Sequence, residues 1–246
     1  MNSFGITDKG SVRKENQDSF VIESCEKRHC VTAVICDGMG GAKAGDLASR
    51  LSCRAFAGRV YAALLDAKIA SSSVFKKLLT ESCEEANGVV YQYSRFDPEC
   101  SGMGTTLVGG IVTRRRAYLV NVGDSRAYHL TRKGIWQITR DHSYVQMLVD
   151  SGAITAQEAK EHPKKNIIMR ALGVERKVGS DYFEVDLRPG EAILLCSDGL
   201  SNTVSDDEMY SVFCSEKTPE LICRKLTDIA LERGASDNIS VVIVKV

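Results

Sequence analysis

The segment VICDGMGG, residues 34–41, ends an apolar run in a carboxylate and continues with three glycines and one methionine. A second segment, LLCSDGL at residues 194–200, repeats the order of an apolar run, a cysteine and then Asp-Gly. Short apolar runs of this kind are typical of buried strands. Asp-Gly is also a strong hairpin signal, but both segments lead into helical or irregular sequence rather than a returning strand. A hairpin turn therefore does not explain them.

Two long stretches have the period of an amphipathic helix. Apolar residues recur at three- to five-residue steps from Ala44 to Leu64, and a similar stripe runs from about Ser73 to Tyr93. Short strand-like segments at hairpin spacing occupy residues 105–139, and their short connections indicate antiparallel pairing. Further strands are predicted at residues 19–24, 30–36, 182–187, 192–197 and 239–246.

Capping patterns mark the starts of three further helices. Residues 155–158 and 205–208 have the form of capping boxes, and Thr218 followed by Pro219 is a favourable helix start. In total, about ten strands and four or five amphipathic helices are predicted. Because a helix with one apolar face must cover a sheet, the predicted fold class is α+β, a four-layer α-β-β-α sandwich of two mostly antiparallel sheets flanked by helices. Residues 1–246 are expected to form a single domain.

Charge and hydropathy exclude several classes of function. The 246 residues include 32 Lys or Arg and 32 Asp or Glu, so no global field favours nucleic acid or an anionic membrane. The basic run at residues 114–116 is typical of a solvated hairpin tip. The N-terminus lacks the apolar core of a signal peptide, and no apolar run reaches the roughly 20 residues that a membrane helix needs. The protein is therefore expected in the cytoplasm, without nucleic-acid or membrane partners.

Cysteine and histidine do not form a convincing site. Nine cysteines are scattered without a CxxC spacing, which argues against a zinc site and against a disulfide framework. Cys36 and Cys196 lie in apolar runs beside carboxylates, where a thiolate is disfavoured, so a cysteine nucleophile is not expected. His29 and His129 are predicted on strands with no evident partner, and we interpret them as structural.

Aspartates recur where predicted strands end or begin. Taken singly, each is explained by turn chemistry, but five together are not. Gathered carboxylates repel one another and need a hard divalent cation, and the lack of a His or Cys cluster favours Mg²⁺ or Mn²⁺ over Zn²⁺. A glycine after the ligand, such as Gly38, allows the backbone carbonyl itself to approach the metal. The five aspartates are Asp18, Asp37, Asp124, Asp198 and Asp237.

Eight blocks in a fixed order carry a family resemblance. The sequence resembles the metal-dependent, type-2C family of protein serine/threonine phosphatases, in particular its bacterial members. The resemblance covers essentially the whole chain, and eight collinear blocks are far more specific than any one of them. The blocks are RKENQD (13–18), VICDGMGG (34–41), SGMGTT (101–106), NVGDSR (121–126), RDHSYV (140–145), HPKKNIIMRALG (162–173), CSDGLSN (196–202) and ASDNISVVIV (235–244).

The resemblance implies a ligand set. In the family, two metal ions share an aspartate that matches Asp37. The carboxylates that complete the first metal site match Asp198 and Asp237, and the carbonyl of Gly38 matches a ligand of the second. Bacterial relatives often bind a third ion, and Asp124 together with Asp198 matches that site. The implied cofactors are two Mn²⁺ or Mg²⁺ ions. A third ion is implied only by the resemblance to those bacterial relatives that bind one.

The resemblance also implies roles for positions around the metal ions and the substrate. Gln17 and Asp18 match groups that hold metal-bound water, and Arg13 matches the arginine that grips the substrate phosphate, which suits a planar guanidinium. Many animal relatives have a histidine, proposed as the general acid, where this chain has Met39; methionine cannot donate a proton, so the proton donor stays open. Residues 143–170 match the variable flap beside the active site, which we expect to influence substrate choice.

The implied activity is hydrolysis of phosphoserine and phosphothreonine in proteins by a metal-activated water, without a protein nucleophile. The expected partners are phosphoprotein substrates and a Ser/Thr kinase of the eukaryotic-like type. One alternative is a non-catalytic regulatory domain of the same fold, although such domains usually lose metal aspartates that are filled here. Another is an enzyme dedicated to an anti-sigma antagonist, although such relatives usually carry sensor domains, for which this chain is not expected to have room.

Overall fold

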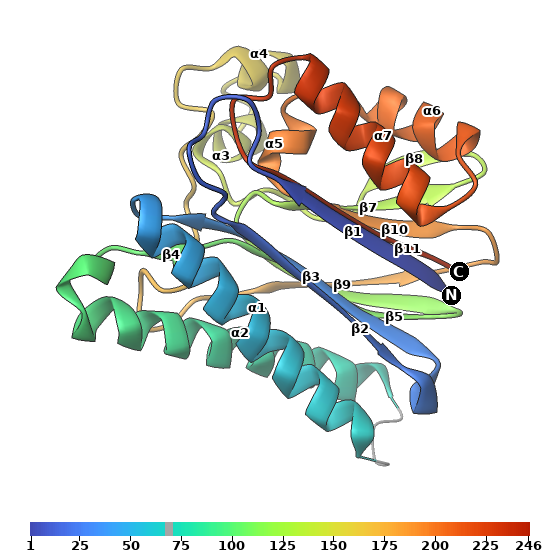
Figure 1. The fold of residues 1–246 in the computed structure, drawn as a ribbon, viewed down its shortest axis with the longest axis horizontal. Coiled ribbons are helices and arrows are strands. Elements are labelled where there is room, and N and C mark those ends of the chain that lie inside the picture. Colours follow the sequence, from blue (N-terminus) through green and yellow to red (C-terminus); the bar gives the residue numbers. More distant parts are fainter. Residues whose placement is uncertain (67–70) are drawn as a thin grey trace.

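A computed structural model describes residues 1–66 and 71–246 as two stacked antiparallel sheets with helices on both outer faces (Figure 1). The first sheet contains, in spatial order, β1 (Asn2–Asp8), β11 (Ile239–Lys245), β10 (Ala192–Cys196), β7 (Arg126–Thr131) and β8 (Gly134–Gln137). The second contains β2 (Asp18–Cys25), β3 (Cys30–Met39), β5 (Leu107–Thr113), β6 (Arg116–Val122) and β9 (Asp181–Asp186), with the short β4 (Gly104–Thr105) paired to β3.

Helices complete the outer layers of the sandwich. The long helices α1 (Ala42–Leu65) and α2 (Ser72–Phe96) cover the second sheet, and α6 (Asp206–Ser215) and α7 (Pro219–Glu232) cover the first (Figure 1). The predicted four-layer α+β sandwich is therefore confirmed. The shorter elements are α3 (Tyr144–Asp150), α4 (Ala156–Glu161), α5 (Asp198–Ser201) and the 3₁₀ turns Glu26–Arg28 and Pro98–Cys100.

The apolar run at residues 33–36 of β3 follows from burial on both faces of the strand. Ile35 belongs to the core between the two sheets, whereas its neighbours Val34 and Cys36 belong to the core beneath α1 and α2. Successive side chains of a strand point to opposite faces, so a strand covered on both sides favours apolar residues at successive positions. The segment at residues 34–41 thus fixes the position of β3 between a helix layer and a second sheet.

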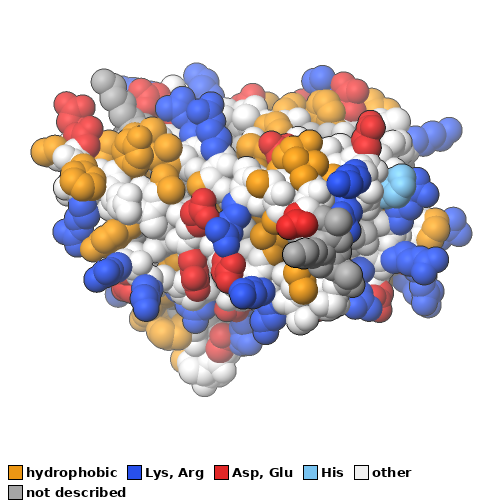
Figure 2. Space-filling view, turned by 90° about the horizontal axis from the view of Figure 1, so that it is seen from below, with side chains coloured by type: hydrophobic (Ala, Val, Ile, Leu, Met, Phe, Trp, Pro, Cys, Tyr) orange, Lys and Arg blue, Asp and Glu red, His pale blue; other side chains and the backbone are white. Residues whose placement is uncertain are grey.

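The outer face of α1 and α2 mixes charges of both signs, and acidic and basic side chains lie side by side over its middle (Figure 2). Arg59 of α1 contacts two carboxylates of α2, Glu81 and Glu85, each at 2.7 Å. These half-exposed ion pairs bridge the two helices and contribute little individually. Within residues 1–66 and 71–246, none of the helices combines the length and apolar character needed to cross a membrane.

The local capping predictions are confirmed. The backbone N–H of Thr155 donates to the Glu158 carboxylate at 2.7 Å, and that of Ser205 donates to Glu208 at 3.0 Å. The side chain of Thr218 caps α7, with Pro219 in the first turn. The cysteines, all within the described ranges, are free thiols, and eight of the nine are buried.

Some predictions of local structure are wrong. The strand β1 was not expected, because its sequence NSFGITD lacks a clear pattern; it exists because it pairs along its whole length with β11. His29 lies in a left-handed turn with φ of 49° rather than on a strand. His129 does have a partner, since its Nε2 lies 2.9 Å from a Glu191 carboxylate oxygen.

The basic hairpin tip also differs from its prediction in one residue. Arg116 belongs to β6, where it pairs with Glu184 at 3.1 Å and Asp186 at 2.7 Å. Only Arg114 and Arg115 of this run form the turn between β5 and β6. The third arginine therefore pairs across the strands β6 and β9 rather than extending into solvent.

Phe56→Ala is expected to lower the free energy of unfolding by about 3–5 kcal/mol, because it leaves a cavity in the core beneath α1. Phe56 is fully buried, whereas Phe96 at the end of α2 is 86% exposed. Phe96→Ala is the matched control and should change the same free energy by less than about 0.5 kcal/mol. Urea unfolding followed by circular dichroism measures both, and equal losses in the two variants would contradict the assigned core.

Candidate metal centre

The predicted site residues meet at the end of the sandwich that lies opposite both chain termini (Figure 1). At this end β3 and β10 finish and β11 begins. A cavity of about 510 Å³ opens there. Its lining includes every predicted site residue except Asp18, namely Arg13, Gln17, Asp37, Gly38, Asp124, Asp198 and Asp237.

Two of the aspartates face each other directly across a pair of strands. Asp18 at the start of β2 is in register with Asp37 near the end of β3. Like charges in such a pair destabilise a sheet. Burial raises the pKa of Asp18 to about 7 and raises that of Asp37 well above its usual range, and the charge of Asp18 adds to the shift at Asp37. An uncompensated pair of carboxylates at this position is therefore unfavourable.

The other three aspartates lie within electrostatic reach of the same point. The charges of Asp198, Asp124 and Asp237 each raise the pKa of Asp37 further, after burial and Asp18. Burial is also the main cause that raises the pKa of Asp124 to about 7 and that of Asp198 to about 6. The structure thus brings together all five aspartates that the sequence singles out.

Several carboxylate oxygens in this cluster are buried without compensation. The Oδ1 atoms of Asp18, Asp124 and Asp198 have no hydrogen-bond partner among the residues that the structure describes. Their Oδ2 atoms differ: Ser197 Oγ donates to Asp18 at 2.7 Å, and Asn202 Nδ2 donates to Asp198 at 3.1 Å. Buried carboxylate oxygens without donors are costly unless a cation satisfies them.

Asp237 has a different environment at the mouth of the cavity. Its Oδ2 accepts a hydrogen bond from Arg13 Nη2 at 2.7 Å, and its Oδ1 accepts one from the backbone N–H of Asn238 at 2.9 Å. The Arg13 side chain is 54% exposed. Its pKa is raised by the contact with Asp237 and, more weakly, by Asp37 and Asp198. The guanidinium therefore faces both solvent and the aspartate cluster.

The glycines of the opening segment have a packing role that the sequence did not reveal. A Cβ on Gly38 would lie 2.0 Å from the carbonyl oxygen of Gly45, so this position must be glycine for α1 to approach β3. Gly40 and Gly41 adopt φ angles of 113° and 91°, which favour glycine, in the turn that leads into α1. The glycines that follow Asp37 thus allow the end of β3 to pack closely against the first turn of α1.

The backbone of Asp37 is fixed by two threonines. Its N–H donates to Thr106 Oγ1 at 2.9 Å, and its carbonyl accepts from the Thr106 N–H at 2.9 Å and from Thr105 Oγ1 at 2.8 Å. Thr106 is itself hydrogen-bonded to Ser125 at 2.7 Å. Sequence reasoning assigned no role to these residues, although the threonines lie in the quoted block SGMGTT.

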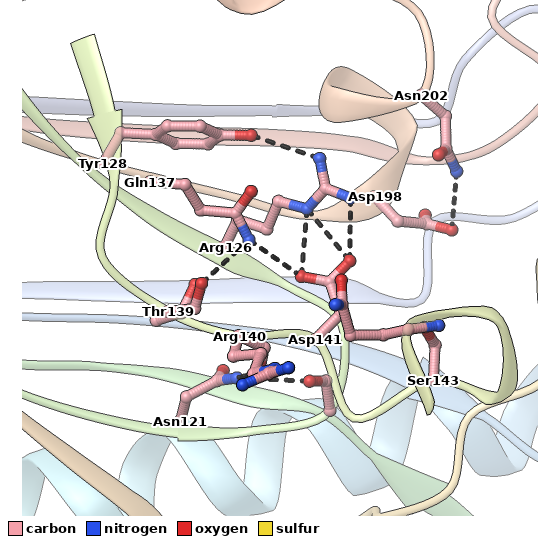
Figure 3. A network of polar contacts seen from close by, with 12 residues as sticks. Asn121, Arg126, Tyr128, Gln137, Thr139, Arg140, Asp141, Ser143, Asp198 and Asn202 are labelled. Carbon is pink, nitrogen blue, oxygen red and sulfur yellow. Dashed lines mark hydrogen bonds and ion pairs between the residues drawn. The ribbon is translucent and has the colours of Figure 1, made fainter. Parts of the chain in front are cut away.

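A partly buried ion pair, between Arg126 and Asp141, lies beside the cluster (Figure 3). Arg126 Nη2 contacts Asp141 Oδ2 at 2.7 Å, and Arg126 Nε contacts both oxygens of the same carboxylate. The charge of Arg126 opposes the effect of burial on the pKa of Asp124 and of Asp198. Arg126 therefore offsets part of the negative charge of the cluster. Sequence reasoning missed this role, because no local signal links Arg126 to Asp141.

Asn238 ties the loop that carries Arg13 to the start of β11. Its Oδ1 accepts from the backbone N–H of Gln17 at 2.9 Å, and its Nδ2 donates to the carbonyls of Lys9 and Glu15 at 2.9 and 3.0 Å. The side chain of Gln17 donates to the carbonyl of Gly41 at 2.7 Å. Asn238 was also missed by sequence reasoning, although it follows Asp237 directly.

The donor set fits oxygen-preferring divalent ions. Within the described ranges, no three His, Cys, Asp or Glu side chains form a ready-made cage for one ion. Four of the aspartates, all except Asp18, instead line a wide cavity, which suits ions that retain several water ligands, as Mg²⁺ does. The unpaired carboxylate oxygens of Asp124 and Asp198 would gain a cationic partner there.

The predicted flap borders this cavity. Asn166 and Ile168 contribute to its lining. A second cavity of about 440 Å³ lies between α3, α4 and the loop that joins α5 to α6, and it shares Asp124 and Asp198 with the first. Residues 143–170 therefore contribute to the lining of both cavities.

The chain is similar to proteins of known family. The family model "Protein phosphatase 2C" matches residues 10–223. The serine/threonine phosphatase stp of Listeria monocytogenes serotype 4b is 38% identical over 242 residues, which cover 97% of this chain and 93% of that protein.

Solved structures agree with this relationship. The serine/threonine phosphatase Stp1 from Staphylococcus aureus superposes with a TM-score of 0.90 and 33% identity, covering 99% of this chain and 94% of that one. The catalytic domain of the serine/threonine protein phosphatase PstP, in complex with two manganese ions, has a TM-score of 0.83 and 32% identity, covering 99% and 97% of the two chains.

Asp37→Asn is expected to remove most of the stabilisation that Mn²⁺ gives to the chelator-treated protein, because Asp37 faces the other four aspartates. At 100 times the Kd, ligand binding stabilises a folded protein by about 2.7 kcal/mol. For a chain of this length, that corresponds to roughly 5–10 °C in Tm. Differential scanning fluorimetry with and without Mn²⁺ measures the shift.

Asp228→Asn is the matched control, because it neutralises an exposed carboxylate on α7 that does not line the cavity of the cluster. This variant should keep the wild-type response to Mn²⁺. A Mn²⁺-induced shift of the same size in the Asp37→Asn variant would refute the placement of the metal centre.

Proposed function

This chain belongs to the protein phosphatase 2C family and is a serine/threonine protein phosphatase, and on that premise we propose that its aspartate cluster is a Mn²⁺ or Mg²⁺ centre. One observation carries the proposal: four carboxylates converge on Asp37, and three of the five aspartates bury an oxygen that has no partner among the described residues. The alternative of a non-catalytic domain is not favoured, because such domains usually lack part of this set.

We assign the ligands as follows. Asp37 would be shared by two ions, and Asp198 and Asp237 would complete the site of the first. The carbonyl of Gly38 would serve the second ion. Asp124 and Asp198 would hold a third ion, and the unpaired, buried Oδ1 atom on each of them supports this assignment.

Further residues hold solvent around the ions. Asp18 and Gln17 orient the water molecules of the centre. The position of Asp18 directly opposite Asp37 supports its role, and the contact of the Gln17 side chain with Gly41 places that side chain beside the turn after β3.

Divalent ions, when bound, activate water as the nucleophile and neutralise charge on the phosphoryl oxygens. The chain itself then binds and orients the substrate. Arg13 is paired with Asp237 at 2.7 Å without substrate. When Asp237 serves as a metal ligand, the guanidinium can turn its planar fork to the substrate phosphate. Met39 also lines the cavity but cannot donate a proton to the leaving group.

The substrates proposed are proteins phosphorylated by a Ser/Thr kinase of the eukaryotic-like type. We place the activity in the cytoplasm, which agrees with nine free thiols. We also propose that residues 1–246 act as one catalytic domain. Its support is the match of 97% of this chain to 93% of the Listeria phosphatase.

Asp198→Asn is expected to reduce kcat for a phosphothreonine peptide by at least about 100-fold in the presence of Mn²⁺, because one ligand loses its charge. Release of inorganic phosphate measures the rate, and circular dichroism verifies that the variant is folded. Asp228→Asn should turn over like the wild type. A folded Asp198→Asn variant with wild-type kcat would refute the site assignment.

Arg13→Ala should raise KM for the same peptide by about 10-fold, with kcat changed by less than about 3-fold, because the change removes phosphate binding rather than metal chemistry. Arg13→Lys retains the positive charge but loses the planar guanidinium that can bind a phosphate through two hydrogen bonds. Its KM is therefore expected to lie between those of the wild type and Arg13→Ala. Arg54→Ala on the exposed face of α1 is the control. Steady-state kinetics at saturating Mn²⁺ provide the values, and an unchanged KM in Arg13→Ala would contradict its role.

A further inference from the structure

A smaller hollow of about 230 Å³, lined by apolar and charged side chains, adjoins the catalytic cavity. Met39 and Ile168 line both spaces. The rest of the hollow's lining includes the apolar side chains Met169, Val174 and Val178 and the charged side chains Arg170, Glu175 and Lys177. It therefore begins where the segment of proposed metal ligands ends, one residue after Gly38.

The wall between the two spaces depends on a glycine. A Cβ on Gly104 would lie 2.9 Å from Met39 Cε and 3.0 Å from Val174 Cγ2. The side chains of Met39 and Val174 thus converge over Gly104, and any larger residue there would displace them. The lack of a side chain at Gly104 in β4 therefore leaves room for the two side chains that form this wall.

Its apolar lining is open to solvent. Met169 is 55% exposed and Val174 is 50% exposed. Single exposed apolar side chains need no explanation, but these gather around one hollow that continues a substrate cavity. Arg170, which also lines the hollow, is paired with Asp181 at 3.2 Å. Apolar side chains around a concavity are typical of a surface that a partner covers.

We propose that this hollow binds an apolar side chain, of the size of leucine or methionine, that lies one or two positions from the phosphorylated residue of a protein substrate. The inference rests on the proposed function, because the phosphate must first be placed at the metal centre. One or two residues of extended chain span roughly 3–7 Å, so a side chain at such a position stays near the phosphorylated residue and is directed to a space that shares Met39 and Ile168 with the catalytic cavity. Ligand sites for small molecules usually exceed about 300 Å³, so the volume favours one side chain.

A leucine in the hollow should raise kcat/KM by about 10-fold over a serine, the low end of what an apolar pocket contributes to specificity. The test uses the full chain with Mn²⁺ and phosphothreonine peptides that carry leucine at −2, −1, +1 or +2 in an otherwise serine-glycine background. At least one leucine position should show the 10-fold preference in the wild type.

Val174→Asn and Met169→Gln should each reduce that leucine-to-serine ratio to about 2-fold or less, because they place polar groups in the hollow. The ratio is measured within each variant, so a general loss of activity does not affect it. Val74→Asn, at a partly exposed valine on α2, is the matched control and should keep the wild-type ratio.

Two outcomes would overturn the inference while leaving the proposed function intact. The first is a wild type that hydrolyses the peptides with no leucine position preferred by more than 2-fold. The second is a preference that survives both Val174→Asn and Met169→Gln. A wild type that hydrolyses none of the peptides with Mn²⁺ would instead overturn the proposed function, and this inference with it.

Discussion

The pair of carboxylates formed by the buried Asp18 and by Asp37, which lines the cavity, governs the rest of the site. The two carboxylates are in register on neighbouring antiparallel strands, where their mutual repulsion opposes the pairing that holds them. Hydrogen bonds compensate only in part, since Ser197 reaches one oxygen of Asp18 and leaves the other without a partner in the described structure. A sheet with this conflict is most stable when a cation lies beside it. Cation affinity and folding are therefore coupled at this position.

The distance between the proposed ligands depends on the packing of the two sheets. Asp37 comes from the second sheet, whereas Asp198 and Asp237 flank strands of the first. Ile35 of β3 and Ile193 of β10 belong to the apolar core that separates these sheets. Protein cores are close-packed and deform little, so this core sets the spacing between the proposed ligands. The two sheets together thus position the site, and neither sheet carries the complete set of proposed ligands.

Local chemistry explains which features could be predicted from sequence. The long helices, the strand β3 and the capping boxes follow from periodicity and from side-chain to backbone hydrogen bonds within a few residues. The strand β1 could not be predicted, because its pairing with β11 joins the two ends of the chain. The aspartates were found because each stands at a strand boundary. Arg126 and Asn238 were missed, because their roles arise from partners that only the folded chain brings near.

Met39 connects the proposed catalytic and specificity features in one side chain. A residue at this position lines the catalytic cavity and, in this chain, also the apolar hollow beside it. A titratable side chain could donate a proton here but would place a polar group at the wall of the hollow, which is costly without a partner. Methionine is flexible and apolar and fills an irregular gap well. The chain therefore gains an apolar wall for substrate recognition at the position where it forgoes a proton donor, and the proton for the leaving group must come from solvent or from a group other than residue 39.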